Sequence, residues 1–301
     1  GSENPVRLGG GWMKGNNERK ESAAGSFIRR YCNNKLAVAG FFVLLTIALI
    51  VILVPPFLPF SEAEIDALAF NAPPGGKHIL GGDDVGRDVL SRLLYGGRVS
   101  LFVGIISTAV SVVIGIPLGM IAAFYRGVFE IIVMRLSDIF MSFPATILIL
   151  FLVSMFGPSI ITVTVVIGVL GWPKFARQIY GSVLSVREKD YIEGGIAIGA
   201  RDSKIITRYI LPNAIAPIFI SITFRIASAI ILESSLSFLG MGVQPPAASW
   251  GNMLYNAQSI TILTSRPWMW VPPGLALVIT ILSINFIGNG MRDALDPKTK
   301  I

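Results

Sequence analysis

The sequence predicts an all-α polytopic membrane protein with six transmembrane helices. Of its 301 residues, 53% are hydrophobic and only 14% are charged, whereas soluble domains carry about 25% charged residues. Six apolar stretches each reach the ~20 residues that a helix needs to cross a bilayer. Lysine and arginine gather on alternate sides of these stretches, as membrane topology requires. These observations exclude a disordered chain and disfavour an ordinary soluble enzyme.

The six predicted spans are joined by loops of very different length. The first is too long for a signal-peptide core, so we predict a permanent anchor. The third is interrupted at residues 142–144, where a proline predicts either an ordinary kink or a hinge. The predicted spans are residues 36–60, 101–124, 129–156, a fourth from 159 to beyond 172, 215–238 and 271–288.

Orientation follows from the basic residues, because cytoplasmic loops are enriched in lysine and arginine. With a cytoplasmic N-terminus, eighteen of the 25 basic residues lie on the inner side and five on the outer side. Both termini are therefore expected in the cytoplasm, as tails 1–35 and 291–301. An extracytoplasmic loop is expected at 61–99, with an amphipathic helix that Asp84 caps near Val85. Residues 100–290 form the core, which includes a cytoplasmic loop at 173–213.

Several kinds of chemistry are excluded by the residues that the chain lacks. It has one cysteine, Cys32, and one histidine, His78, which is too few for a disulfide framework or a His/Cys metal cluster. It contains no GxxxxGK[ST] phosphate-binding loop. We therefore predict no catalytic residue, no metal and no cofactor on this chain. The net charge of +7 is attributed to cytoplasmic loops rather than to nucleic-acid binding.

Residues 191–213 carry the most informative pattern in the sequence. They predict a short helix, a break at Gly199, and a second amphipathic helix that stops at Pro212. Apolar residues of the second helix share one face and basic residues share another. A helix of this kind lies on a membrane or docks into another protein. The apolar set is Ile205, Ile206, Tyr209 and Ile210, and the basic set is Arg201, Lys204 and Arg208.

This stretch resembles the cytoplasmic EAA loop of binding-protein-dependent ABC importer permeases. That loop has an acidic start, a glycine six residues later and a Leu-Pro ending, which Glu193, Gly199 and residues 211–212 match. Gly194 and Gly195 stand where alanines are usual. Each glycine costs up to about 1 kcal/mol in helix propensity, so the loop is expected to become rigid only with its partner.

Further segments are similar to the C-type permease subunit of dipeptide, oligopeptide and nickel importers. Residues 80–92 (LGGDDVGRDVLSR) resemble the segment before its second span, although Gly82 stands where threonine is common. Residues 235–242 (SLSFLGMG), with the following PP and SWG, resemble its fifth span and outer loop. Residues 292–297 (RDALDP) resemble its ending. The resemblance therefore covers nearly the whole membrane part.

The resemblance implies a type I ABC importer permease fold and a transport subunit of the bacterial inner membrane. It implies four kinds of partner: a homologous second permease, two cytoplasmic ATPases that carry ATP and Mg²⁺, an extracytoplasmic solute-binding protein, and membrane lipid. Peptides are the leading substrate class, with nickel chelates, opines and glutathione left open. The residues expected to couple to the ATPases are Tyr191, Glu193, Gly199, Ala200, Arg201, Leu211 and Pro212.

Charges inside the spans are expected to face protein or water, as a structural ion pair or as part of a pathway or gate, because each costs ~2.5–3.5 kcal/mol on insertion scales. Arg135 and Asp138 share one helical face and are expected to pair with each other. Arg225 and Glu233 are about 12 Å apart along their helix, so we expect a partner on the sister permease. The predicted pathway or gate residues are Arg135, Asp138, Phe143, Pro144, Arg225 and Glu233.

The outer segments carry charged and aromatic residues. Asp84, Arg87, Asp88 and Trp250 predict either a capped surface helix or a docking place for the binding protein. A membrane-embedded enzyme would need a buried nucleophile with a base, or HExxH, which the single histidine does not supply. A self-sufficient channel or secondary transporter would show inverted repeats or half-helices, which we do not find. Dependence on partner proteins separates these classes from a permease.

Overall fold

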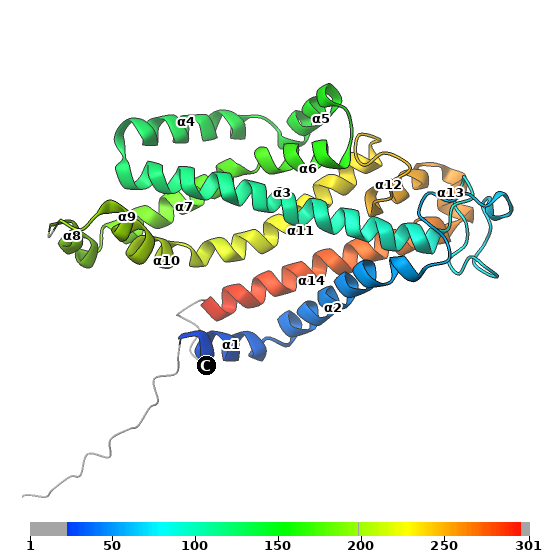
Figure 1. Cartoon of the computed structure of the whole chain (residues 1–301), viewed down its shortest axis with the longest axis horizontal. Helices are drawn as coiled ribbons and strands as arrows, with labels where there is room; N and C mark the ends of the chain where they lie inside the picture. The colour runs from blue at the N-terminus through cyan, green and yellow to red at the C-terminus, as the bar shows by residue number, and fades with distance from the viewer. Residues whose placement is uncertain (1–22, 198, 296–301) are drawn as a thin grey trace, which may run out of the picture.

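The computed structural model describes residues 23–197 and 199–295. Long helices run side by side along the molecule, and shorter ones close both ends (Figure 1). The long elements are α2 (Lys35–Leu53), α3 (Val89–Tyr125), α6 (Ile160–Val169) followed by α7 (Trp172–Arg187), α11 (Ala216–Phe238) and α14 (Val271–Leu295). The shorter helices are α1 (Ala23–Asn33), α4 (Gly127–Ser142), α5 (Ala145–Phe156), α8 (Asp190–Ala197), α9 (Asp202–Ile205), α10 (Leu211–Ala214), α12 (Trp250–Tyr255) and α13 (Ile260–Ser265).

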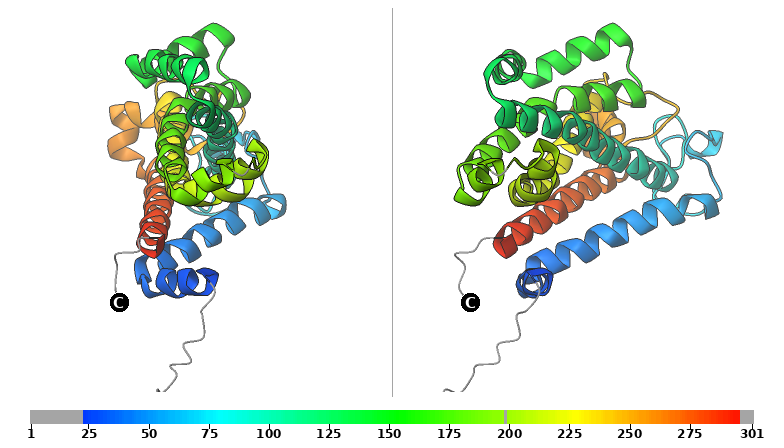
Figure 2. Two further views of the ribbon diagram at one scale, coloured as in Figure 1. Left: turned by 90° about the vertical axis from the view of Figure 1, so that its left-hand side faces the viewer. Right: turned by 60° about the vertical axis from the view of Figure 1, so that its left-hand side comes forward.

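The bundle has two different ends. One end carries α8, α9 and α10, and the other carries residues 54–88 with α12 and α13, which we call the loop end (Figure 1). α4 and α5 lie on the flank opposite α1 and α2 in every view (Figure 2). The described residues contain no β-strand, only isolated bridges that hold residues 65–88 together.

α3 is the central helix, and it begins four residues later than the sequence predicts. Asp88, not Asp84, is its N-cap, since an Asp88 carboxylate oxygen accepts the Ser91 amide at 2.7 Å. Asp84 instead accepts a hydrogen bond from Asn256 at 2.7 Å. Residues 89–99 are thus the first turns of the second span rather than a separate outer helix, and α3 is about 55 Å long.

α3 and α7 pack closely because α3 presents glycine to α7. A Cβ on Gly119 would lie 2.1 Å from the Ala176 carbonyl oxygen, and one on Gly115 would lie 2.6 Å from the Trp172 carbonyl oxygen. Small residues four apart on a helix allow such close packing. α7 continues the fourth span, and together α6 and α7 cover 28 apolar-rich residues. The first part of the loop predicted at 173–213 is therefore helical, up to Arg187.

The third predicted span is broken rather than kinked. α4 and α5 meet at 88°, with Phe143 and Pro144 both in extended conformations. Proline lacks an amide and disfavours helical geometry in the residue before it, so two residues leave the helix together. Within the described part of the chain, five helices are long and apolar enough to cross a membrane, and the bent pair gives a sixth if it is one span.

The expected N-terminal tail contains structure. α1 precedes α2, whose N-cap Asn34 accepts the Ala37 amide and donates to Asp293 at 2.9 Å. Asn34 thereby ties the start of the first span to the end of α14. Residues 1–22 and 296–301 lie outside the described part.

Candidate functional site

Residues 190–214, which we call the coupling segment, cap one end of the bundle beside the end of α7 (Figure 1). α8 ends in a Schellman motif. Gly199 has a φ of 75°, and the Ala200 amide donates to the Gly195 carbonyl oxygen at 3.1 Å. The predicted break at Gly199 is therefore confirmed.

The second helix of the segment runs through Pro212, which corrects the predicted stop. Residues Ile206–Ile210 form a π-helix, and the Leu211 amide donates to the Ile206 carbonyl oxygen. Pro212 lies in the first turn of α10, where its missing amide is tolerated. The Asn213 side chain donates to the Tyr209 carbonyl oxygen at 2.6 Å. The wide turn accommodates the proline, and such turns recur at functional sites.

Buried isoleucines pack the coupling segment against the rest of the bundle. Ile192, Ile205 and Ile210 are at most 1% exposed and belong to one apolar cluster with side chains of α3, α7 and α11. The predicted apolar face is thus partly correct. Ile206 is half-buried, but Tyr209 is 40% exposed, because the π-helix shifts the register of the face.

The residues predicted to meet the ATPases share this segment. Tyr191, Gly199, Arg201 and Pro212 are exposed, whereas Ala200 and Leu211 are half-buried. Glu193 lies in α8, and its side chain is outside the described part. The coupling segment therefore packs on the bundle through its apolar side and exposes its polar side.

Alanine at position 194 or 195 is expected to stiffen α8. A Cβ on Gly194 or Gly195 meets nothing within 4 Å, so the substitution gains helix propensity without a clash. Each change should slow amide hydrogen exchange in α8 about fivefold. The matched control is Gly199→Ala, which strains a left-handed residue and should speed exchange. Unchanged or faster exchange in both alanine variants would contradict this prediction.

The intramembrane charge pair is part of a three-residue group. Asp138 lies 3.8 Å from Arg135, as the sequence predicts, and also forms an ion pair with Arg177 of α7. All three side chains are at least 42% exposed in this chain. Sequence reasoning missed Arg177 because it placed residue 177 in a loop. Only the apolar face of α7, with buried Phe175, indicated that the helix continues.

Arg225 and Glu233 are not each other's partners, as predicted, and both form hydrogen bonds within this chain. Arg225 donates to the Ile167 carbonyl oxygen at 2.8 Å. Glu233 is fully buried and accepts hydrogen bonds from three serine hydroxyls of its own chain. Those are Ser100 at 3.2 Å, Ser234 at 3.4 Å and Ser237 at 2.7 Å. This chain's own side chains enclose the carboxylate completely.

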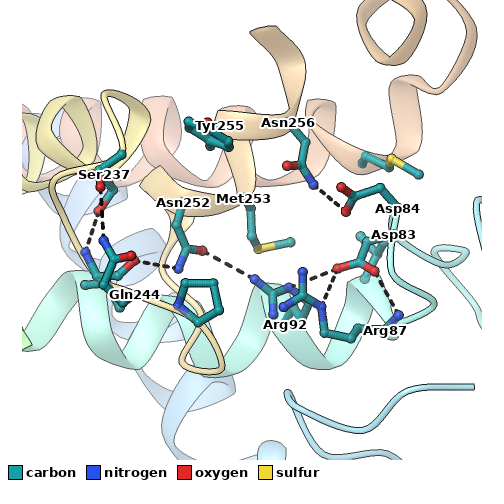
Figure 3. Close-up of a pocket in the computed structure, with 15 residues that line it drawn as sticks. Asp83, Asp84, Arg87, Arg92, Ser237, Gln244, Asn252, Met253, Tyr255 and Asn256 are labelled. Carbon is teal, nitrogen blue, oxygen red and sulfur yellow. Dashed lines mark hydrogen bonds and ion pairs between the residues drawn. The ribbon is translucent and has the colours of Figure 1, made fainter. Parts of the chain in front are cut away.

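A cavity of about 370 Å³ opens at the loop end, between the start of α3 and the 237–256 region (Figure 3). Asp83, Arg87 and Arg92 approach it from one side, and Gln244 and Asn252 from the other. Arg87 Nε donates to Asp83 at 2.7 Å. The cavity is thus lined by two segments that are about 150 residues apart in the sequence.

The predicted docking residues divide into two kinds. Asp84 and Arg87 line the cavity. Asp88 and Trp250 are 4% and 1% exposed. They are therefore buried in the protein and do not face a partner. Asp88 is occupied as a helix cap, and Trp250 Nε1 donates to the Leu93 carbonyl oxygen at 2.9 Å.

His78 clamps the loop end to the start of α3. Its Nδ1 lies 2.9 Å from Asp88, and its Nε2 lies 3.3 Å from Asp66. Phe60 stacks on the imidazole with ring centroids 4.6 Å apart. Burial lowers the pKa of His78, but the hydrogen bonds and charges of Asp88 and Asp66 outweigh it, so its pKa is raised. The amide of Leu68 and then His78 lower the pKa of Asp66.

The clamp is expected to weaken as the pH rises. A raised folded-state pKa means that the stabilisation is fully present below the unfolded value of about 6.5 and is lost as pH passes the folded value. The thermal midpoint of the wild type minus that of His78→Gln should therefore shrink between pH 5.5 and 8.5. A difference that stays constant or grows over this range would contradict the role assigned to His78.

Residues 115–301 match the family model described as the inner membrane component of binding-protein-dependent transport systems. Residues 22–74 match the N-terminal transmembrane domain of oligopeptide transport permease C. The chain belongs to this permease family. The resemblance that the coupling segment carries is thereby confirmed, and the protein is a multi-pass inner-membrane component of a transport system.

Relatives of the permease extend over most of its length. A protein of Brucella ovis that is named as a peptide permease is 42% identical over 90% of both chains. A glutathione transport system permease of Pectobacterium atrosepticum is 40% identical over 91% of both. A dipeptide transport system permease of Alkalihalophilus pseudofirmus is 36% identical over 89% of this chain and 87% of that one.

A solved structure shares the fold of the permease. One chain of the inward-facing MetNI methionine ABC transporter superposes with a TM-score of 0.56 at 20% identity. The match covers 68% of this chain and 97% of that one. The fold is therefore that of an ABC importer permease.

Proposed function

We propose that this chain is one of two permease subunits of an ATP-driven importer of peptides. The observation that carries the proposal is the coupling segment, which is seated on buried isoleucines with its polar face open at one end of the bundle. The chain would supply half of the translocation pathway. Two partner ATPases would bind ATP and Mg²⁺, and a solute-binding protein would deliver the substrate.

The packing of the segment supports a mechanical role. Ile205 and Ile210 contact a cluster that includes Val183 of α7 and Ile218 of α11. A force on the exposed face would pass to both helices, because close-packed interiors transmit displacement. α11 would carry it toward the loop end, where Ser237 and Val243 are joined by a hydrogen bond of 3.1 Å.

The proposed orientation places the coupling segment in the cytoplasm and the loop end outside. It is supported by the excess of lysine and arginine on the segments at the coupling end. Both termini would then be cytoplasmic.

Asp138, Arg135 and Arg177 would face the sister permease or the pathway, because exposed charges at this depth are costly against lipid. Phe143 and Pro144, at the 88° bend, would act as a gate hinge.

Affinity purification from native membranes in mild detergent tests the proposal. A P-loop ATPase and a second permease should co-purify with the wild type. Arg201→Glu and Gly199→Val should release the ATPase while the second permease remains. The matched control is Gly181→Ala, at an exposed position of α7 where a Cβ meets nothing. If the protein emerges alone, or only with itself, the importer assignment is wrong and a channel should be tested.

Glutathione is the second candidate substrate, because the named glutathione permease is 40% identical over 91% of this chain. Uptake of a labelled dipeptide should be inhibited by excess unlabelled dipeptide and only weakly by glutathione, a nickel chelate or an opine. Stronger inhibition by one of the latter would reassign the substrate but keep the importer.

A further inference from the structure

We propose that Arg225, near the middle of α11, binds the terminal carboxylate of a transported peptide during its passage through the membrane. The inference rests on the proposed function, because it needs α11 to line the translocation pathway. Arg225 lies about 14 Å along the helix axis from Ala216 and about 20 Å from Phe238, the two ends of α11. Its charge is therefore far from both ends of the span.

Arg225 is a cation without an acidic partner in the described part of the chain. Its Nη2 donates to the Ile167 carbonyl oxygen at 2.8 Å, and this is the one hydrogen bond that the guanidinium forms with the described residues. None of their carboxylates pairs with it, and none of their charged side chains acts on it from further away. Intramembrane arginines pair with another group or face water, so this charge calls for an anion from outside the described chain.

One edge of the guanidinium is enclosed and another is open. Nε is buried without a hydrogen-bond partner, whereas Nη1, which also has no partner among the described residues, is not enclosed. The side chain packs over the joint between α6 and α7, where a Cβ on Gly171 would lie 2.4 Å from Nη2. The Ile167 carbonyl oxygen holds the group in place, and the Nη1 edge remains for a ligand. Guanidinium groups bind carboxylates through paired N–H···O bonds.

The face of α11 around Arg225 is polar. Ser221 and Ser228 lie four residues before and three residues after Arg225, so all three share one face, which Ser235 continues. Ser228 and Ser235 are exposed and Ser221 is half-buried, whereas Ile230 on the opposite side is fully buried. The three hydroxyls donate to carbonyl oxygens of the preceding turn, at 3.3, 2.9 and 2.8 Å. Their lone pairs remain for water, which suits a hydrated passage.

A terminal carboxylate is the anion that this position serves best. Peptides and glutathione, the two candidate substrates, both end in a carboxylate whatever their side chains are. A carboxylate at this depth has lost most of its water, and an isolated charge there is unfavourable. Charge-assisted hydrogen bonds from a fixed guanidinium replace part of that hydration. Arg225 would therefore speed the passage of every substrate that carries this group.

Uptake of a peptide and of its C-terminal amide by the complete reconstituted transporter tests the inference. The two substrates differ in the charged group, and any preference of the binding protein cancels because it is the same for every permease variant. Arg225→Gln should lower the maximal uptake rate of the free acid about tenfold or more, but that of the amide less than about threefold. Arg225→Lys keeps the charge without the fork and should fall between wild type and Arg225→Gln.

Ser111→Ala is the matched control, because it weakens the same helix joint without removing the charge. Ser111 Oγ donates to the Gly168 carbonyl oxygen at 2.7 Å. This variant should change the uptake of acid and amide by the same factor. If Arg225→Gln also lowers both by the same factor, Arg225 merely caps the end of α6 and the inference is wrong.

Photo-labelling of the unmodified transporter keeps the test decisive if the Arg225 variants do not fold or the amide is not delivered. A dipeptide with benzoylphenylalanine as its C-terminal residue should label residues 221–229, mapped by mass spectrometry. The isomer with benzoylphenylalanine at its N-terminus should label this segment several-fold less. Equal labelling by the two isomers, or labelling of other segments alone, would overturn the inference.

The outcomes separate this inference from the proposed function. If the wild type takes up neither acid nor amide in a manner that needs ATP and the binding protein, the proposed function fails and the inference fails with it. Equal losses for acid and amide would overturn the inference alone. So would release of the sister permease from Arg225→Gln during purification, because the guanidinium would then pair with a carboxylate of that subunit.

Discussion

Gly119→Ala is expected to destabilise the protein by about 3 kcal/mol, the upper part of the range for overpacking. The new Cβ would lie 2.1 Å from the Ala176 carbonyl oxygen and 2.5 Å from Ile179 Cγ2. The first obstacle is backbone, so no rotamer change relieves it and α7 must move away from α3. Membrane helices associate through close packing rather than through a hydrophobic driving force, so a separation is not recovered elsewhere.

The effect of Gly119→Ala should also reach transport. α7 carries Phe175, Ile179 and Val183 in the cluster that seats the coupling segment. A displacement of α7 therefore also displaces the apolar cluster on which the coupling segment packs. The thermal midpoint should fall by about 6–12 °C, and uptake should fall with it. Both can be measured on one preparation, by thermal scans in nanodiscs and by uptake into proteoliposomes.

Gly181→Ala is the matched control, because it makes the same change on α7 where a Cβ meets nothing within 4 Å. It should keep or raise the midpoint, since alanine has the better helix propensity. A Gly119→Ala protein as stable as Gly181→Ala would show that the contact between α3 and α7 tolerates a methyl group.

The fold was predictable where a single periodicity dominates. Runs of apolar residues predicted the spans. The bend at residues 143–144 was visible as a proline, but its 88° angle depends on Phe143 leaving the helix as well. α7 was misjudged because only one of its faces is apolar. Lys174 and Arg177 made it look like a loop, and burial of the other face is a tertiary property.

The candidate sites show the same division. Glycine at position 199 was identifiable, because a Schellman ending requires a left-handed residue. The π-helix before Pro212 was not, since it depends on how the segment meets α7. Arg92 and Asn252 are 160 residues apart, and no local pattern connects them. The sequence therefore indicated one side of the loop-end cavity, through Asp84 and Arg87, but not the other side.

Glu233→Ala is expected to cost about 3–5 kcal/mol, because it leaves a cavity and removes the acceptor from a buried network. Ser100 and Ser237 donate to its carboxyl oxygens, at 3.2 and 2.7 Å. Their lone pairs are then free to accept the amides of Trp250 and Val243, at 3.2 and 3.1 Å.

This polarity makes Glu233 the organiser of the region that walls the loop-end cavity. Without it, the hydroxyls of Ser100 and Ser237 have no fixed orientation, and the amides of Val243 and Trp250 lose their aligned acceptors. Hydrogen exchange at those two amides should accelerate more than tenfold, whereas exchange in α2 should stay unchanged.

Two variants separate the effect of losing the hydrogen-bond acceptor from the effect of losing side-chain volume. Glu233→Gln keeps the shape but presents an NH₂ group toward one serine, which must then accept and turn its proton toward a backbone amide. It should cost about 1–3 kcal/mol. Ser235→Ala, two residues along α11, removes an exposed hydroxyl that bonds only the Ile231 carbonyl oxygen, and should change neither stability nor exchange. A Glu233→Gln protein that matches Ser235→Ala would mean that the serines reorient freely and that shape alone holds the 241–256 region.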